Sequence, residues 1–142
     1  MTSEHNKRIA REAFEALMAG HLTDIGELVT SDAVLHQCGF LHPIPARSIV
    51  DRTLPGPRPL LDPHVRIERI VAEGDLVALH WRTSGQYQDP DGGYPGGTEI
   101  SFPSMTFLRF EDGRVSEIWN IQDPATIQTQ LHAWTERRDE AR

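Results

Sequence analysis

The sequence is poor in lysine and cysteine and has no long apolar run. Lys7 is the one lysine among 142 residues, and its place near the N-terminus argues against Schiff-base catalysis, which needs a lysine amine in a pocket. Cys38 is the one cysteine, which excludes an internal disulfide bond and suits a reducing compartment. No apolar run approaches the roughly 18 residues of a membrane span, and the N-terminal segment lacks a secretion-signal core. We therefore expect a cytoplasmic protein without a membrane partner.

The remaining composition is that of one soluble domain. A chain of 142 residues can bury a core, and we expect residues 1–142 to form a single domain. Fourteen basic and 21 acidic residues give a net charge of −7, which argues against nucleic acid as a partner because that would need a clustered basic face.

Motifs for metals and cofactors are also missing. His36, Cys38 and His42 match no zinc spacing, and no acidic residue lies near them to complete a site. The sequence has no phosphate-binding glycine loop, no nucleophile elbow and no HExxH motif. The sequence therefore predicts no metal site and no cofactor.

Helices come first along the chain. The apolar stripe of residues 3–19 predicts a helix that stops at Gly20, and a second short helix is expected at about 24–30, after the cap-like Thr23. Residues 32–38 (DAVLHQC) read as a short strand. Six prolines between residues 43 and 63 leave room for at most a short helix near 46–53, so the rest is expected to be loop.

Strands dominate the second half. We expect strands at about 64–72 and 76–84, a Gly- and Pro-rich loop at 85–97, and a hairpin of strands 98–110 and 114–121 around Asp112-Gly113, followed by a helix. Period-two alternation puts Ser104, Thr106 and Leu108 on one face of the first hairpin strand, and Ile118 with Asn120 on one face of the second. Helices followed by a run of antiparallel strands indicate an α+β domain.

Three segments carry a family resemblance: AFEALMAGHLTDIGELVTSDAVLH, IVAEGDLVALHWRTSGQY and FLRFEDGRVSEIWNIQD. In this order they resemble the SnoaL-like polyketide cyclases, which belong with nuclear transport factor 2 and ketosteroid isomerase. The resemblance covers nearly the whole chain except the proline-rich 40–63 segment. It implies a cone-shaped α+β barrel, in which a curved antiparallel sheet wraps around N-terminal helices and encloses an apolar pocket. It also implies a metal-free protein and a homodimer formed through the sheet.

The resemblance places the family's acid/base pair at Thr106 and Asn120. SnoaL-like cyclases carry a histidine and an aspartate at these two positions, and neither threonine nor asparagine ionises near neutral pH. The three groups of ketosteroid isomerase would fall at Ala13, Gln37 and Thr106, so all three are replaced. The resemblance thus implies the fold, but this chain lacks the usual proton-transfer groups.

Strand phase suggests which side chains line the pocket instead. In strand 76–84 we favour the face with Ala78, His80 and Arg82, because His80 would supply a group that exchanges protons near neutral pH. Arg82 would hold a carboxylate or polarise a carbonyl, and a one-residue change of register would reverse the face. The expected site comprises the catalytic residues His80, Thr106, Asn120 and Asp123 and the substrate-binding residues Phe14, Gln37, Arg82, Tyr87 and Ile118.

Simpler roles compete with these. His80 can be a surface or structural histidine, and Arg82 can pair across strands with an acid such as Glu117. Asp123 matches a family acid, but Asp123-Pro124 is also a helix start. Tyr87 can close over a ligand or lie exposed in its loop.

Two classes of function fit the sequence. The first is a cofactor-independent enzyme that closes or rearranges a ring in an apolar, polyketide-like substrate, with His80 as proton relay. The second is a small-molecule binding or accessory protein with the same pocket. The replaced pair at Thr106 and Asn120 favours binding, and the polar pocket lining favours catalysis.

Overall fold

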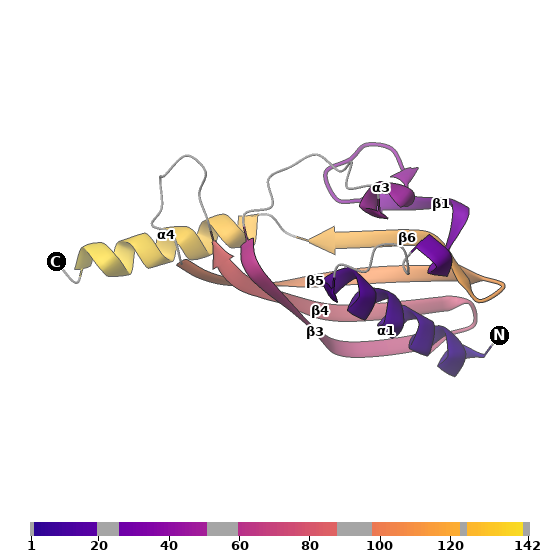
Figure 1. Cartoon of the computed structure of the whole chain (residues 1–142). Helices are drawn as coiled ribbons and strands as arrows, with labels where there is room; N and C mark the ends of the chain where they lie inside the picture. The colour runs from indigo at the N-terminus through magenta and orange to yellow at the C-terminus, as the bar shows by residue number, and fades with distance from the viewer. Residues whose placement is uncertain (1, 20–25, 51–59, 88–97, 123–124, 141–142) are drawn as a thin grey trace.

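The computed structural model describes residues 2–19, 26–50, 60–87, 98–122 and 125–140. These residues form an α+β fold with one mixed sheet (Figure 1). The elements are α1 (Ser3–Ala19), β1 (Val29–Gln37), β2 (Ile44–Pro45), α3 (Arg47–Val50), β3 (Leu60–Glu73), β4 (Leu76–Tyr87), β5 (Thr98–Glu111), β6 (Arg114–Gln122) and α4 (Ala125–Glu140).

The six strands lie in the order β2-β1-β6-β5-β4-β3 and form a curved, unclosed sheet. Strands β3 to β6 are consecutive antiparallel neighbours, as expected. The expectation of a purely antiparallel sheet is wrong in one place, because β1 pairs with β6 in parallel. A parallel pair needs a long crossover connection, and the whole segment from β2 to β5 separates these two strands in the sequence.

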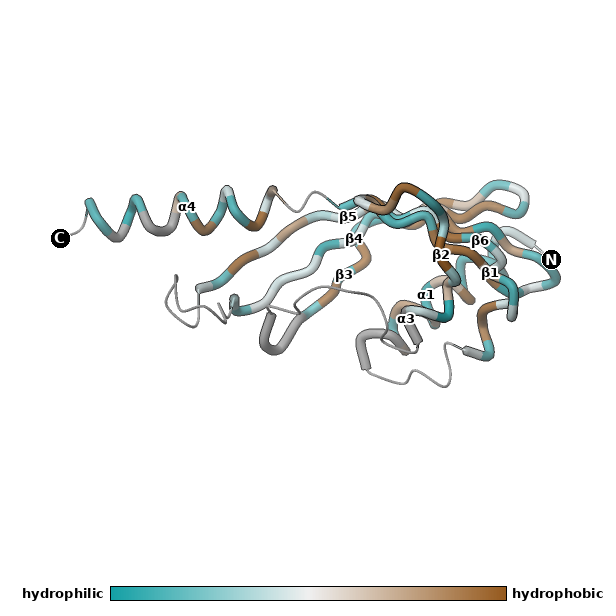
Figure 2. Tube along the Cα trace, turned by 90° about the horizontal axis from the view of Figure 1, so that it is seen from above, coloured by the Kyte–Doolittle hydropathy of each residue, from teal (hydrophilic) through white to brown (hydrophobic). Residues whose placement is uncertain are grey.

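One face of the sheet is covered by α1 and α3, which lie on the same side of it in Figure 2. The buried side chains of β4 are those of alternate residues, as period two requires. They join Ile9 and Ala10 of α1 in one hydrophobic core. We call the face that contributes to this core the inner face, and the opposite face the outer face.

The Asp112-Gly113 hairpin is confirmed. Both residues have positive φ, 49° and 77°, as a tight two-residue turn between β5 and β6 requires. The register of the pair shifts once after the turn, between Arg109 and Phe110, and beyond this shift Thr106 lies opposite Asn120. The sequence-predicted α1 is also confirmed, with the bounds 3–19.

Other element bounds differ from expectation. Helical backbone is described at residues 26–28 only, and β1 already begins at Val29, so the predicted helix at 24–30 is too long and the predicted strand at 32–38 too short. Strand β3 begins at Leu60, inside the proline-rich segment expected to be loop. It tolerates Pro63 because β3 is an edge strand and its register shifts between Leu61 and His64.

Helix α4 extends beyond the ends of the strands, away from the rest of the chain (Figure 1). Its contact with the sheet is made at β5, where Gln130 uses both ends of its side-chain amide. Gln130 Oε1 accepts a hydrogen bond from the Ser101 backbone nitrogen at 2.9 Å, and Gln130 Nε2 donates to the Ser101 carbonyl. Strand β6 pairs with β5 only from Ser104 onward, so Gln130 occupies the edge that β6 leaves open.

Candidate functional site

The inner face of β4, β5 and β6 is apolar at one end and neutral-polar at the other. Among the described strand residues, none of the inner-face positions on these three strands has a His, Asp, Glu, Lys, Arg or Cys side chain. The polar ones are Trp81, Thr83 and Tyr87 of β4, Thr98, Ser104 and Thr106 of β5, and Asn120 and Gln122 of β6. This face can therefore hold a polar group by hydrogen bonds, but its described strand positions offer no imidazole or carboxylate for proton transfer.

A series of hydrogen bonds links side chains of these three strands and of β1. Trp81 Nε1 donates to Thr106 Oγ1 at 2.8 Å, and Thr106 Oγ1 donates to Asn120 Oδ1 at 2.8 Å. Asn120 Nδ2 donates to Gln37 Oε1 at 3.1 Å. The four residues come from β4, β5, β6 and β1, so the curvature and register of the sheet bring them together. The structure therefore brings together Gln37, Thr106 and Asn120, three of the residues expected in the site.

Phe14 and Ile118, which were predicted to line the pocket, lie beside this series of hydrogen-bonded side chains. The Phe14 ring of α1 meets the Trp81 ring edge-on, with centroids 5.3 Å apart. Ile118 packs partly buried against the hydrophobic core and lies opposite Leu108. Both therefore lie on the inner side of the sheet, and Phe14 fixes the position of the indole.

Ser104 is a further polar residue of the inner face that the sequence-based site omitted. It is 2% exposed, it pairs in register with Trp81, and its Oγ has no hydrogen-bond partner in the described part of the chain. A buried hydroxyl without a partner is costly and indicates a place for a ligand or water oxygen. Its phase with Thr106 was visible in the sequence, but the missing partner depends on the packing.

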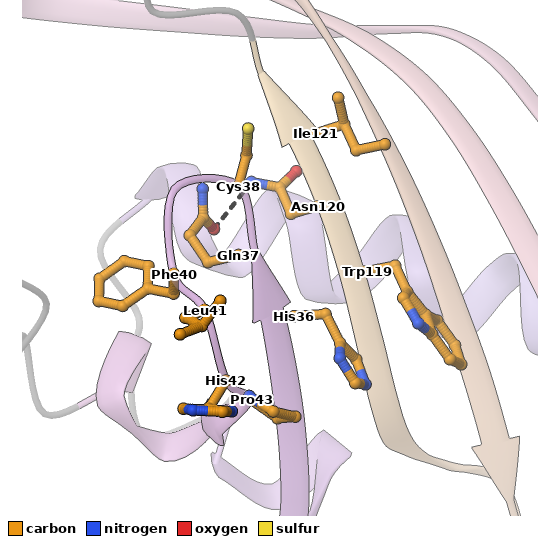
Figure 3. A pocket seen from close by; sticks show the side chains of 10 residues that line it. All are labelled: His36, Gln37, Cys38, Phe40, Leu41, His42, Pro43, Trp119, Asn120 and Ile121. Atoms are coloured by element: carbon orange, nitrogen blue, oxygen red, sulfur yellow. Dashed lines mark hydrogen bonds between the residues drawn. The ribbon is translucent and has the colours of Figure 1, made fainter.

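Gln37 and Asn120, the last two residues of this hydrogen-bonded series, line a surface hollow of about 320 Å³. Figure 3 shows the Gln37 and Asn120 side chains pointing toward each other at the ends of β1 and β6, beside the loop that follows β1. The hollow is lined by His36, Gln37, Cys38, Phe40, Leu41, His42, Pro43, Trp119, Asn120 and Ile121. It curves round the strand ends, so residues of both faces line it, and it gives a small molecule access to the two amides.

His80 and Arg82 do not lie with these residues. The buried residues of β4 are Val77, Leu79 and Trp81, so His80 and Arg82 lie on the outer face, and the predicted face of this strand is wrong. His80 pairs in register with Met105, which is 55% exposed. The physical reason is the register: each one-residue step turns a strand side chain to the other face.

The outer-face partners of these two residues belong mainly to β3. His80 Nδ1 lies 3.0 Å from Arg69 Nη1. Arg82 donates to Ser101 Oγ at 3.1 Å and lies 3.6 Å from Glu68 Oε1, so its acidic neighbour is Glu68 and not Glu117. The hydrogen bond from Arg66 lowers the pKa of Glu68 most, and the charges of Arg66, Arg82 and His80 lower it further, against a smaller opposing effect of desolvation.

Glu117 instead joins a second outer-face cluster. Glu117 Oε2 lies 2.7 Å from His36 Nε2, and Glu117 Oε1 lies 3.6 Å from Arg109 Nε. Trp119 lies between a stacked His36 ring, 5.2 Å away, and the Arg109 guanidinium, 5.7 Å away. The ionisable groups of the sheet thus gather on the outer face.

Two predicted site residues remain. Asp123 lies outside the described residues. Tyr87 is the last residue of β4 rather than part of the following loop, and it pairs in register with Thr98. Within the described ranges no group of three His, Cys, Asp or Glu side chains could hold a metal ion. No described helix is both long and apolar enough to cross a bilayer.

A curved sheet with a helix over its inner face and a polar cluster at one end defines a cone-shaped α+β protein of the kind that holds small molecules. The family model of the SnoaL-like polyketide cyclases matches residues 7–131, and the chain belongs to that family. A search of curated proteins found no match.

Solved structures agree with the fold. IdmH from Streptomyces antibioticus, named as a candidate polyketide cyclase, is 27% identical with a TM-score of 0.77, over 89% of this chain and 98% of IdmH. AclR from Streptomyces galilaeus, named as a candidate hydroxylase, is 22% identical with a TM-score of 0.74, over 93% of this chain and 98% of AclR. A candidate ketosteroid isomerase from Kribbella flavida is 19% identical with a TM-score of 0.64, over 85% of this chain and 79% of its own.

Proposed function

We propose that the protein is a cofactor-independent enzyme that closes or rearranges a ring in an apolar, polyketide-like natural-product intermediate. The observation that supports this most is the hydrogen-bonded set of Trp81, Thr106, Asn120 and Gln37. Two of its members, Thr106 and Asn120, stand where the family resemblance places the catalytic pair. Membership of the SnoaL-like cyclase family supports the reaction class. IdmH, the 27% identical neighbour, is itself named as a candidate cyclase.

The proposed mechanism relies on binding and orientation rather than on proton transfer by a side chain. Asn120 and Gln37 hydrogen-bond a substrate oxygen, while the apolar inner face folds the carbon skeleton. Holding reacting atoms in place is worth about 7–11 kcal/mol in favourable cases. Fixed donors directed at an oxygen that gains negative charge contribute roughly 10²–10³-fold each. Thr106 acts through Asn120, because its hydroxyl is occupied by Trp81 and Asn120.

A binding or accessory role is the second candidate. The specific observation in its favour is that Thr106 and Asn120 replace the family's histidine and aspartate, and that no described inner-face strand position of β4, β5 or β6 supplies another imidazole or carboxylate. In this role the same amides hold a ligand oxygen without a chemical change.

Asn120→Leu tests the proposed enzyme, because leucine keeps the volume and removes both amide groups. Turnover of an uncyclised polyketide-like substrate is followed by chromatography and NMR, since an isomerisation leaves the mass unchanged. We expect kcat/KM to fall roughly 10²–10³-fold. Two matched controls should stay within about twofold: Gln86→Leu, at an exposed amide of β4, and His80→Ala on the outer face.

The outcomes separate the two candidates. Turnover that needs Asn120 but not Gln86 supports the enzyme. Ligand binding that Asn120→Leu weakens, with no new compound after long incubation, supports the binding protein. Turnover unaffected by Asn120→Leu would sink the proposed site.

We further propose that the protein forms a homodimer through the outer face. Four large apolar side chains are exposed there: Val71 at 63%, Met105 at 55%, Phe107 at 51% and Ile121 at 64%. A hollow of about 450 Å³ on the β3–β5 side is lined by Val71, Ala72, Glu73, Leu76, Ala78 and Phe107. Contiguous exposed apolar surface of this kind marks an association site. The cytoplasmic location stays a prediction.

A further inference from the structure

The hydrogen-bond chain of the inner face runs in one direction, and Trp81 is the residue that sets this direction. An indole N–H can only donate, so Thr106 Oγ1 has to accept from Trp81. The single hydrogen of the threonine hydroxyl then goes to Asn120 Oδ1, 2.8 Å away. Asn120 consequently presents Nδ2 to Gln37 Oε1.

Burial prevents water from replacing these partners. Trp81 is 7% exposed and Thr106 is 4% exposed, so an unmatched group at either position would carry the full cost of desolvation. Trp81 is itself fixed by Phe14, whose ring packs edge-on against it. The direction is therefore set at the buried end and passed on toward the surface hollow that Gln37 and Asn120 line.

The two amides keep free hydrogens at the hollow. An amide nitrogen carries two hydrogens, and Asn120 Nδ2 gives one of them to Gln37. Gln37 Nε2 has no hydrogen-bond partner within the described part of the chain. Each amide oxygen already accepts one hydrogen bond, Asn120 Oδ1 from Thr106 and Gln37 Oε1 from Asn120. With the opposite direction, Gln37 Oε1 would be turned outward with both lone pairs free.

We propose that Trp81 is a positioning residue that turns the free amide hydrogens of Gln37 and Asn120 toward the ligand, so that the inner-face site favours ligands with a carbonyl or enolate oxygen. Ligands whose polar group can only donate are bound less well, because both amide oxygens already accept one hydrogen bond. This inference rests on the proposed use of the inner face as the ligand site, and it deepens that proposal by naming the ligand chemistry.

The test compares two probes of the same shape. 2-Acetylnaphthalene carries a carbonyl oxygen, and 2-isopropenylnaphthalene has a CH₂ group in its place. We expect the wild-type protein to bind the ketone roughly tenfold more tightly, as one or two hydrogen bonds imply. We also expect the infrared carbonyl band of the bound ketone to shift to lower frequency.

Trp81→Phe keeps an aromatic ring against Phe14 and removes the N–H. We expect the tenfold preference to fall toward one and the carbonyl shift to shrink, with the alkene bound as before. Trp134→Phe makes the same substitution in α4, which extends away from the rest of the chain, and this control should keep both signals. Thr106→Val breaks the next link and should reproduce the effect of Trp81→Phe, so the test stands if Trp81→Phe does not fold.

Three results overturn the inference: a wild type that does not prefer the ketone, a Trp81→Phe variant that keeps both signals, or, if that variant does not fold, a Thr106→Val variant that keeps them. None of these concerns turnover. A loss of turnover in Asn120→Leu together with an unchanged carbonyl band in Trp81→Phe would retain the proposed function and remove only the role of Trp81. Turnover that is independent of Asn120 would remove the proposed function itself.

Discussion

The two faces of the sheet carry opposite kinds of polar chemistry. On the inner face, polar side chains are neutral and bonded to one another, from Trp81 through Thr106 to Asn120. On the outer face they are charged, with one cluster around Glu68 and another around Glu117. The same strands produce both, because alternate residues of one strand belong to different faces. The difference teaches that the type of a polar residue says little about its role until its face is known.

The difference in burial between the faces predicts the largest effect. Ile100 on the inner face is 1% exposed and Ile121 on the outer face is 64% exposed, so they form a matched pair. We expect Ile100→Ala to lower the free energy of unfolding by roughly 2–5 kcal/mol, because it removes buried methyl groups and leaves a cavity. Ile121→Ala should cost less than about 1 kcal/mol.

Urea unfolding at two protein concentrations measures this pair. A contribution of Ile121 to association depends on concentration, whereas a contribution to folding of the protomer does not. Equal, concentration-independent losses for Ile100→Ala and Ile121→Ala would mean that the two faces are not different in burial.

Association through the outer face gives the second prediction. Phe107→Asp places a charge among exposed apolar side chains, and a carboxylate there is costly to desolvate at an interface. We expect a dimer to dissociate to monomers, with dimer affinity weakened by 100-fold or more, on the order of the 3–5 kcal/mol of an uncompensated buried charge. Light scattering coupled to size-exclusion chromatography measures it. Gln128→Asp, at an exposed position of α4, is the control with the same change of charge.

A Phe107→Asp protein that stays dimeric would mean that the partner binds elsewhere. A wild type that is monomeric at all concentrations would remove the proposed dimer altogether.

The charge of Glu68 gives the smallest effect. The Arg66 hydrogen bond holds the pKa of Glu68 below its usual 4.5 in the folded protein. A carboxyl with a lowered folded-state pKa stabilises the protein above its unfolded-state pKa, and this contribution is lost as the pH falls through the folded-state pKa. We expect Glu68→Gln to lower the Tm slightly at pH 6, and the gap to the wild type to close as the pH falls below about 4.5.

Thermal unfolding between pH 6 and pH 3 measures the gap. Added salt should reduce it, because the groups are exposed and screened. Glu99→Gln, at an exposed position of β5, is the control. A gap that is constant over this range would show that the charge of Glu68 does not matter for stability.

Local patterns predicted most of the fold. The apolar stripe of α1 and the Asp112-Gly113 turn are determined by neighbouring residues, so the sequence alone sufficed. The parallel pairing of β1 with β6 depends on contacts between residues more than 80 positions apart, such as Gln37 and Asn120, and no local pattern contains it. The start of β3 in the proline-rich segment was not predicted. Proline is compatible with an edge strand but not with a central one, and the sequence alone does not show that β3 lies at the edge of the sheet.

The site was predictable only in part. Thr106 and Asn120 lie in the two strands joined by the Asp112-Gly113 turn, but their pairing also depends on a register shift between Arg109 and Phe110. Gln37 followed from the family resemblance, because it lies on β1, which pairs with β6 in parallel. Strand 76–84 alternates throughout, and both of its faces contain aromatic or polar residues, so the sequence could not decide between His80 and Trp81. Packing decides it, because the large apolar side chains of Val77, Leu79 and Trp81 have to be buried together.

The hydrogen bonds of Gln130 to the backbone of β5 also bear on how this strand can associate with other molecules. A row of unpaired backbone groups on a strand is a template on which another chain can add a strand of its own. The Gln130 amide occupies the Ser101 backbone groups and so blocks this template with a side chain instead of a strand. We therefore expect Gln130, on the helix that extends from the rest of the chain, to limit strand addition at this edge of β5. A substitution of Gln130 is expected to increase aggregation while leaving the chemistry of the inner face intact.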